Sequence, residues 1–151
     1  MALPGSILFC CDHNAVRSPM AEGIMKKLFG TRVFVQSAGV WSDLEVDGFA
    51  VAVAREIGVD ITRHRARSLT EMEEWGDDID AFDRIVALSP GAQRQALEFT
   101  REYHVDISYW PVLDPTGLGD RREERLAAYR QTRDQIFDRI RMKFGHADGS
   151  S

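Results

Sequence analysis

Hydrophobic residues cluster in four short runs along the chain, at residues 7–10, 33–35, 85–88 and 107–110. Each run has the length of a β-strand, and longer stretches compatible with helices separate the runs. This alternation predicts a single α/β domain in which a four-stranded parallel sheet is flanked by helices on both faces. In such a sheet ligands bind beyond the carboxyl ends of the strands, so the residues that follow each run are the first candidates for chemistry.

The spacing of apolar residues predicts the helices between these runs. It is clearest over residues 121–144, where three- and four-residue spacing predicts a long helix with one face on the sheet and its charged residues in water. Residues 49–57 alternate in part as a strand would, but interleaved alanines and the need for a crossover favour a helix. The acidic stretch 71–83 predicts a short helix and a solvated connection. Residues 146–151 are expected to fray, which leaves residues 1–145 as the domain.

The first run leads into the most informative segment of the chain. Cys11 follows it directly, and Arg17 lies six positions later, where Pro19 marks the expected start of a helix. A loop of this length can turn its backbone N–H groups toward an anion, while the helix adds the positive end of its dipole. Arg17 would close over that anion with two donors, and the positive surroundings favour the thiolate form of Cys11. The spacing therefore predicts a nucleophile that attacks phosphorus, whereas Cys10 is expected only to pack in the core.

Composition and charge narrow the class of protein. With 151 residues, 44% of them hydrophobic, the chain can form one packed core and not two ordinary domains. A net charge of −5 argues against nucleic acid as a partner, because phosphate backbones bind basic surfaces. No stretch approaches the ~20 apolar residues of a membrane span, and no export signal is visible. We expect a cytoplasmic protein with reduced thiols, since two adjacent cysteines cannot staple distant parts of a fold.

The segment ILFCCDHNAVRSPMAE, residues 7–22, resembles the signature of the low-molecular-weight protein tyrosine phosphatase family, whose fold is shared by thioredoxin-linked arsenate reductases. Further segments similar to the family follow in the family's order, at residues 37–39, 64–70, 82–86 and 111–115. The resemblance spans nearly the whole chain and implies the fold predicted above.

The resemblance also implies roles for three residues. Cys11 would be the nucleophile, Arg17 the clamp that stabilises the transition state, and Asp114 the general acid. Phosphoryl transfer to sulfur leaves an alkoxide or phenoxide that needs a proton, and a carboxylic acid opposite the nucleophile supplies it. The ionised Asp114 would then activate water, while Pro115 restricts it to an extended backbone. An Asp-Pro pair alone is more often a simple turn, so the assignment depends on Cys11 and Arg17.

Supporting residues follow from the same resemblance. Ser18 would donate to the thiolate, while Asn14, Ser37 and His64 would form the hydrogen-bond network that holds the loop. Asparagine tolerates left-handed backbone angles, which suits a position inside a tight loop. The loop residues expected to surround the phosphate are Asp12, His13, Asn14, Ala15, Val16 and Ser18.

Several positions depart from the family's pattern. The family usually has glycine where His13 stands and a small neutral or apolar residue where Asp12 stands; a carboxylate there opposes phosphate binding unless it points away. Val16 replaces a cysteine that many members carry. Thr116-Gly117 stand where two aromatic residues often wall the substrate cleft. Trp41 is the remaining candidate for stacking on an aryl ring, with an ordinary core position as the equal alternative.

Three functions are compatible with these residues. The leading prediction is a phosphatase that hydrolyses phosphotyrosine or related phosphomonoesters through a cysteinyl-phosphate, without metal or cofactor. Its partners would be a phosphorylated protein or a small phosphomonoester, with phosphate, sulfate or vanadate able to occupy the loop. An arsenate reductase would need an external small thiol, because the chain lacks the two further cysteines of an internal relay. The third is a non-catalytic phosphate-binding regulatory protein. The choice among phosphotyrosine, phosphoarginine and phosphoserine stays open.

Overall fold

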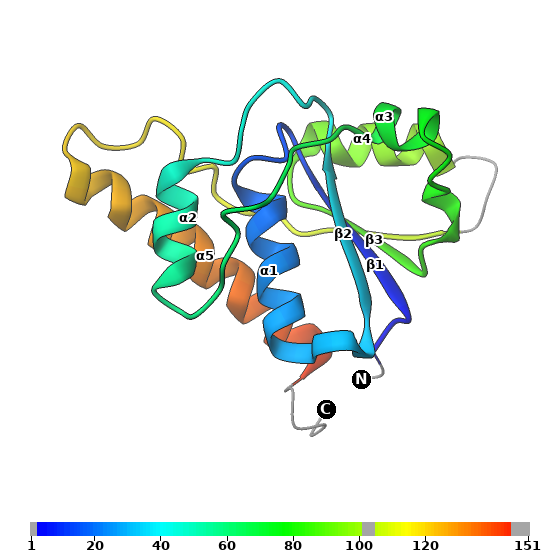
Figure 1. Cartoon of the computed structure of the whole chain (residues 1–151), viewed down its shortest axis with the longest axis horizontal. Helices are drawn as coiled ribbons and strands as arrows, with labels where there is room; N and C mark the ends of the chain where they lie inside the picture. Colours follow the sequence, from blue (N-terminus) through cyan, green and yellow to red (C-terminus); the bar gives the residue numbers. More distant parts are fainter. Residues whose placement is uncertain (1–2, 101–104, 146–151) are drawn as a thin grey trace.

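The centre of the molecule is the predicted four-stranded parallel sheet, with strands in the order β2-β1-β3-β4 (Figure 1). The computed structural model describes residues 3–100 and 105–145, so the expected fraying of residues 146–151 lies outside the described part. In chain order the elements are β1 (Ser6–Cys11), α1 (Arg17–Phe29), η1 (Gly30–Arg32), β2 (Phe34–Gly39), α2 (Gly48–Arg55), α3 (Leu69–Glu74), η2 (Ile79–Ala81), β3 (Arg84–Ala87), α4 (Pro90–Thr100), β4 (Asp106–Tyr109) and α5 (Arg122–Phe144), where η marks a short 3-10 helix.

Helices lie on both sides of the sheet, as predicted: α1, α2 and α5 share a first hydrophobic core with one face, and α3 and α4 share a second core with the other (Figure 1). In β1, Ile7, Phe9 and Cys11 belong to the first core, whereas Leu8 and Cys10 belong to the second. Successive side chains of a strand point to opposite faces, so a strand buried on both faces is hydrophobic at every position. This geometry explains the unbroken first run, and it makes the two cysteines point away from each other.

Cys10 has the packing role expected of it. Its side chain is fully buried in the core between the sheet and the helices α3 and α4. Burial raises the pKa of the Cys10 thiol strongly, because a thiolate would lose its hydration there. Both cysteines are free. Cys10 is therefore an inert apolar side chain rather than a second reactive thiol.

Helix α5 forms where the spacing of apolar residues predicts it, but its packing differs from the prediction. Leu126, Ile136 and Ile140 are buried on one side. Most of that side meets α1 and α2 rather than the sheet, and Phe144 at the end of the helix packs on Trp110, with ring centroids 6.1 Å apart. The first residue of the helix is Arg122, one position after the predicted start.

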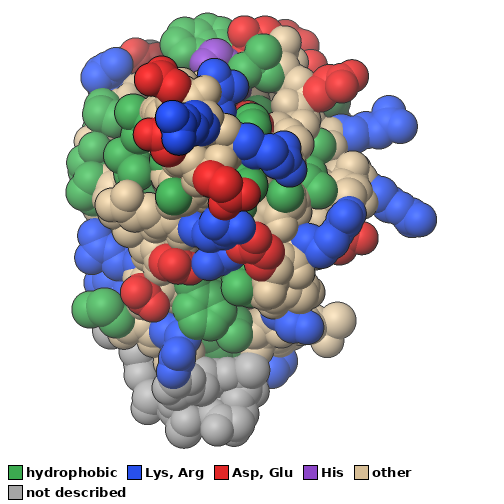
Figure 2. All heavy atoms as spheres, turned by 90° about the vertical axis from the view of Figure 1, so that its left-hand side faces the viewer, with side chains coloured by type: hydrophobic (Ala, Val, Ile, Leu, Met, Phe, Trp, Pro, Cys, Tyr) green, Lys and Arg blue, Asp and Glu red, His purple; other side chains and the backbone are tan. Residues whose placement is uncertain are grey.

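The charged face of α5 is solvated, yet its ion pairs reach another helix. Figure 2 shows basic and acidic side chains interspersed over the face formed by α2 and the first half of α5. Glu56, which follows α2, accepts from Arg130 at 2.8 Å and from Arg133 at 2.7 Å. These arginines lower the pKa of Glu56 to about 2. These pairs join α5 to the end of α2.

Other boundaries differ by a few residues. The stretch 49–57 is helical over Gly48–Arg55, as favoured. Strand β2 continues to Gly39, so Ser37 lies inside the strand instead of after it, because Gly39 pairs with Cys11 of β1. Helix α3 begins at Leu69, where Ser68 and Glu71 cap it reciprocally. Among the described residues, no helix is both long and apolar enough to cross a membrane.

Candidate active site

The loop of residues 12–16 joins the carboxyl end of β1 to α1. Cys11 is the last residue of the strand, and Arg17 is the first of the helix. The helix therefore begins two residues before Pro19, which lies in its first turn, where a missing N–H costs nothing. Asn14 has a φ of 54°, and it is the one residue other than glycine with a left-handed backbone in the described part of the chain. This conformation lets the short loop curl back over the strand end.

Ser18 makes two contacts with the sulfur of Cys11. Its hydroxyl oxygen lies 2.9 Å from Cys11 Sγ, and its backbone N–H donates to the same atom at 3.4 Å. Cys11 is only 2% exposed but lines the cleft described below. Hydrogen-bond donors at the amino terminus of a helix suit a thiolate, which accepts them strongly. The environment fits the nucleophile that the sequence predicts.

The Arg17 guanidinium connects three strand ends. Leu88 follows β3 and Val112 follows β4, and Nη1 donates to the carbonyl oxygen of each at 3.2 Å. Nη2 donates to Asp12 Oδ2 at 3.2 Å and lies 3.7 Å from Asp114 Oδ2. The side chain is 8% exposed, so these contacts hold it in one position beside Cys11.

Asp114 is the most open of the three predicted catalytic residues. Its side chain is 52% exposed, and Oδ1 accepts from the backbone N–H of Thr116 at 3.1 Å. This turn leaves Oδ2 directed toward Arg17. Cys11, Arg17 and Asp114 all line one cleft, although they come from distant parts of the sequence. The structure thus brings together the residues that the resemblance implies as nucleophile, clamp and acid.

Asp12 does not point away from Arg17. One of its oxygens accepts from Arg17, and the other accepts from the Ser89 hydroxyl at 2.7 Å. Ser89 Oγ in turn accepts from the Ala92 N–H at 3.2 Å in the first turn of α4. The unusual carboxylate is therefore paired with the cation of the site and fixed to the start of α4.

Asn14 is the centre of the network that holds the loop. Its side-chain amide donates to the hydroxyls of Ser18 at 2.8 Å and Ser37 at 3.0 Å. Its Oδ1 accepts from His64 Nε2 and from the Arg67 backbone N–H, both at 3.0 Å. These four contacts fill the capacity of a buried amide. The three residues of the expected network, Asn14, Ser37 and His64, are therefore in contact, and Ser18 joins them.

His64 acts as a neutral donor in this arrangement. Its Nε2 lies 3.0 Å from both Asn14 O and Asn14 Oδ1, which are acceptors, so Nε2 carries the proton. Burial is the main cause that lowers the pKa of His64 below its usual value. The neutral imidazole is thus favoured in the folded protein, and its contact is structural rather than an acid-base step.

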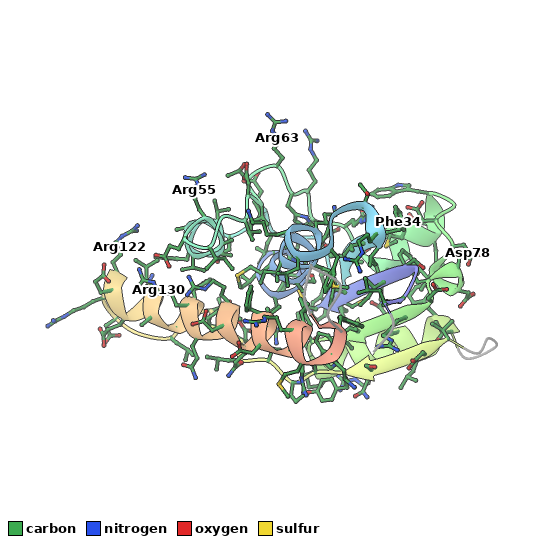
Figure 3. All side chains as sticks on the ribbon, turned by 90° about the horizontal axis from the view of Figure 1, so that it is seen from below. Phe34, Arg55, Arg63, Asp78, Arg122 and Arg130 are labelled. Atoms are coloured by element: carbon green, nitrogen blue, oxygen red, sulfur yellow. The ribbon has the colours of Figure 1, made fainter. Side chains whose placement is uncertain are left out.

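A cleft of about 300 Å³ opens over the loop. Its lining residues are Cys11, Asp12, His13, Ala15, Val16, Arg17, Leu44, Glu45, Asp47, Asp114 and Thr116. Within the described residues, Arg17 is the one arginine or lysine of this lining. Figure 3 shows Arg63 and Arg122 projecting away from the body of the protein.

Trp41 occupies neither of its expected places. It does not line the cleft, and with 55% of its surface exposed it is not a core residue. Its backbone N–H donates to Asp12 O at 2.8 Å, and its ring lies against His13, with centroids 5.4 Å apart. His13 also contacts Asp43 at 2.8 Å. The apolar side chain that walls the cleft from this loop is Leu44.

Some contributors to the site were missed from the sequence. Asp47 caps α2 through its Oδ1, accepts from Tyr129 at 2.8 Å through Oδ2, and donates its N–H to Ala15 O. An aspartate before an apolar helical stretch is a capping signal that could have revealed it. Ser89 had no such signal, because its contact with Asp12 joins residues far apart in the chain, whereas Arg67 lies in the family-like segment 64–70 but was given no role of its own. No group of three His, Cys, Asp or Glu side chains within residues 3–100 and 105–145 could hold a metal ion.

Comparisons with known proteins give one family and two activities. The family described as low molecular weight phosphotyrosine protein phosphatase matches residues 6–144. An arsenate reductase of Oceanobacillus iheyensis is 32% identical over 139 residues, which cover 90% of this chain and 92% of that protein. A probable low molecular weight protein-tyrosine-phosphatase, EpsP of Ralstonia nicotianae, is 35% identical over 94 residues, which cover 62% of this chain and 61% of that protein.

A solved structure resembles the whole fold. It is a mutant of the arginine phosphatase YwlE with a phosphorylated active-site serine. The TM-score is 0.72 with 26% sequence identity, and the match covers 91% of this chain and 92% of that one.

Proposed function

Because the chain belongs to the low-molecular-weight phosphotyrosine protein phosphatase family, we propose that it hydrolyses phosphotyrosine or related phosphomonoesters through a phosphate bound to Cys11. The observation that carries the proposal is the meeting of Cys11, Arg17 and Asp114 in one cleft. The substrate is a phosphorylated protein or a small phosphomonoester, and the cytoplasm supplies the reducing conditions that Cys11 needs.

The first step transfers the phosphoryl group to sulfur. The Cys11 thiolate attacks phosphorus, the bond to the leaving oxygen breaks, and protonated Asp114 gives its proton to that oxygen. Arg17 and the N–H groups of the loop stabilise the negative charge that spreads over the phosphoryl oxygens. The fixed guanidinium needs little reorganisation as this charge develops, which is the advantage of its buried contacts.

The second step regenerates the enzyme. Asp114, now a carboxylate, takes a proton from a water molecule that attacks phosphorus, and the Cys11–phosphorus bond breaks to release phosphate and thiolate. The exposure of Asp114 suits this role, because water and leaving group must both reach it. Ser18 receives the returning charge on sulfur through its hydroxyl and N–H.

Arsenate reduction is the second candidate, since a relative that covers most of the chain is an arsenate reductase. Cys10 points to the opposite face of the sheet, so it cannot pass a disulfide onward from Cys11. The two electrons that turn arsenate into arsenite would have to come from two molecules of an external thiol. A non-catalytic phosphate-binding protein would show neither activity.

One comparison separates the three functions. Hydrolysis of phenyl phosphate and phosphotyrosine is measured with a chelator present, beside arsenate reduction in the presence of glutathione or mycothiol. We expect hydrolysis without metal, inhibited by phosphate or vanadate. Arsenate reduction without hydrolysis would favour the reductase, and phosphate binding with neither activity would favour the regulatory protein. Activity that a divalent ion restores after chelation would contradict the proposed mechanism.

A further inference from the structure

The carboxylate of Asp12 is the feature of the cleft that the proposed function leaves without a role. We propose that Asp12, braced by Ser89, is a positioning residue that holds the Arg17 guanidinium ready for a phosphate. The proposal rests on the proposed function for its kinetic readout and on phosphate binding for a second, independent one.

The donors of Arg17 show what Asp12 contributes. A guanidinium has five N–H donors in a rigid plane. The carbonyls of Leu88 and Val112 engage Nη1, and Asp12 engages Nη2 at 3.2 Å. These hydrogen bonds leave Nε–H and one Nη2–H for a ligand, the number that bidentate binding of a phosphate requires, and Asp114 Oδ2 lies 3.7 Å from Nη2, beyond hydrogen-bond distance. Two contacts through Nη1 alone would allow the plane to swing about that atom, and the third contact prevents this.

Asp12 is itself held from several sides. Its second oxygen accepts from Ser89 at 2.7 Å, and Ser89 is 1% exposed. The backbone of Asp12 accepts from the Trp41 N–H. Gly91 leaves room for the carboxylate, because a Cβ at that position would lie 3.3 Å from Asp12 Oδ1. A buried hydroxyl, a backbone contact and a glycine thus hold this carboxylate in one position.

The negative charge of Asp12 has a cost and a benefit. It repels a phosphate dianion, which weakens ground-state binding. It also gives the 8% exposed guanidinium a fixed acceptor, and misplacing a reacting group by about 1 Å can cost ~10²-fold in rate. If the positioning of Arg17 outweighs the repulsion of phosphate, a neutral residue with the same shape and an acceptor oxygen should preserve turnover. A residue without an acceptor oxygen should not.

Two substitutions at Asp12 test this directly. Asp12→Asn can accept from Arg17 through its amide oxygen and donate to Ser89, so we expect kcat within about threefold of the wild type and tighter phosphate binding. Asp12→Ala leaves Nη2 without that acceptor, so we expect kcat on phenyl phosphate to fall roughly tenfold to ~10²-fold, with weaker phosphate binding. Thermal unfolding of both variants verifies that they are folded.

Ser89→Ala removes the hydroxyl that donates to Asp12 while leaving the carboxylate in place, and we expect an intermediate loss of kcat. Because Ser89 also contacts the first turn of α4, the matched control is Ser68→Ala, which removes the capping hydroxyl of α3 outside the cleft. The control should lose stability by about 1 kcal/mol without the change in kcat.

The outcomes separate the proposal from the function. A lower kcat in Asp12→Ala together with a retained kcat in Asp12→Asn supports the role of Asp12 in positioning Arg17. Equal losses in both variants, or full activity in Asp12→Ala, would overturn it. If the wild type hydrolyses no phosphomonoester, the proposed function fails. Calorimetry with inorganic phosphate then still tests whether Asp12 positions Arg17. Tighter binding by Asp12→Asn and weaker binding by Asp12→Ala support positioning; tighter binding by Asp12→Ala shows repulsion alone and contradicts it.

Discussion

The two walls of the cleft are built in opposite ways. The bonded wall is the loop of residues 12–16 with the side chains that hold it from behind: Asn14, Ser18 and Ser37 are fully buried, and their hydrogen bonds join each other and Cys11. The open wall is the rest of the lining, where Leu44, from the loop after β2, is 50% exposed and Asp114, from the loop after β4, has few contacts of its own. A fully bonded wall permits one geometry, which suits recognition of a phosphoryl group. An open wall can differ in shape and chemistry, so we expect the preference for a leaving group to be determined there.

The largest effect is expected at the base of the bonded wall. Cys11→Ser should abolish hydrolysis while the protein stays folded, because a hydroxyl ionises far less readily than a thiol. Cys10→Ser is the matched control, since Cys10 faces the opposite core, and it should keep most of the activity. Hydrolysis assays on both variants test the assignment. Activity in the Cys11 variant together with loss in the Cys10 variant would show that the other cysteine is the nucleophile.

Asp114 is expected to give the largest effect on the open wall. With phosphotyrosine, Asp114→Asn should lower kcat by ~10²–10⁴-fold, the usual loss of a general acid. An activated nitrophenyl ester needs less protonation of its leaving group, so its first step should suffer less. Transient kinetics on the two substrates measure the difference. Equal losses in the first step would mean that Asp114 is only a turn residue.

Asn14 tests why the bonded wall has one geometry. Asn14→Ala loses the four side-chain contacts and must keep a φ of 54°, whereas Asn14→Gly loses the contacts alone. We expect both to be destabilised by at least about 2 kcal/mol through unpaired buried groups. The alanine variant should lose a further ~1 kcal/mol, because of its backbone. Denaturant unfolding measures both, and wild-type stability in either variant would refute the role of the network.

Much of this bonded wall could be predicted from the sequence. The run ending at Cys11, the position of Arg17 and the resemblance around Asn14 are local features, because strand, loop and helix follow one another directly. The contact of Asp12 with Ser89 could not be predicted, since it joins residues 77 positions apart. Helix α4 was not singled out either, because its buried face consists mainly of small residues such as Ala92 and Ala96.

The open wall was predicted less well. The residue type at position 41 suggested an aromatic wall, but a backbone contact with Asp12 places Trp41 beside His13. Which residue of a loop faces a cleft depends on the path of the backbone, and neither hydrophobic periodicity nor composition reports that path. Leu44 consequently emerged only from the structure.

Leu44 should give the smallest effect. Leu44→Ala removes apolar surface worth about 1 kcal/mol, which is roughly a fivefold loss of kcat/KM for an aryl phosphate. A small alkyl phosphate should be hydrolysed as before. Leu118→Ala is the matched control, because Leu118 is also exposed but lies outside the cleft lining. Equal losses on aryl and alkyl substrates would contradict a contact with the ring.

Trapping the covalent intermediate tests phosphoryl transfer through Cys11 most directly. Asp114→Asn protein is mixed with a nitrophenyl phosphate, quenched within one turnover and mapped by mass spectrometry. Because the variant cannot activate water efficiently, phosphate should accumulate on the sulfur of Cys11, and the same experiment on Cys11→Ser should yield no phosphocysteine. Rapid hydrolysis by the wild type with no phosphate on Cys11 in the trapped variant, or with phosphate on another residue, would contradict phosphoryl transfer through this cysteine.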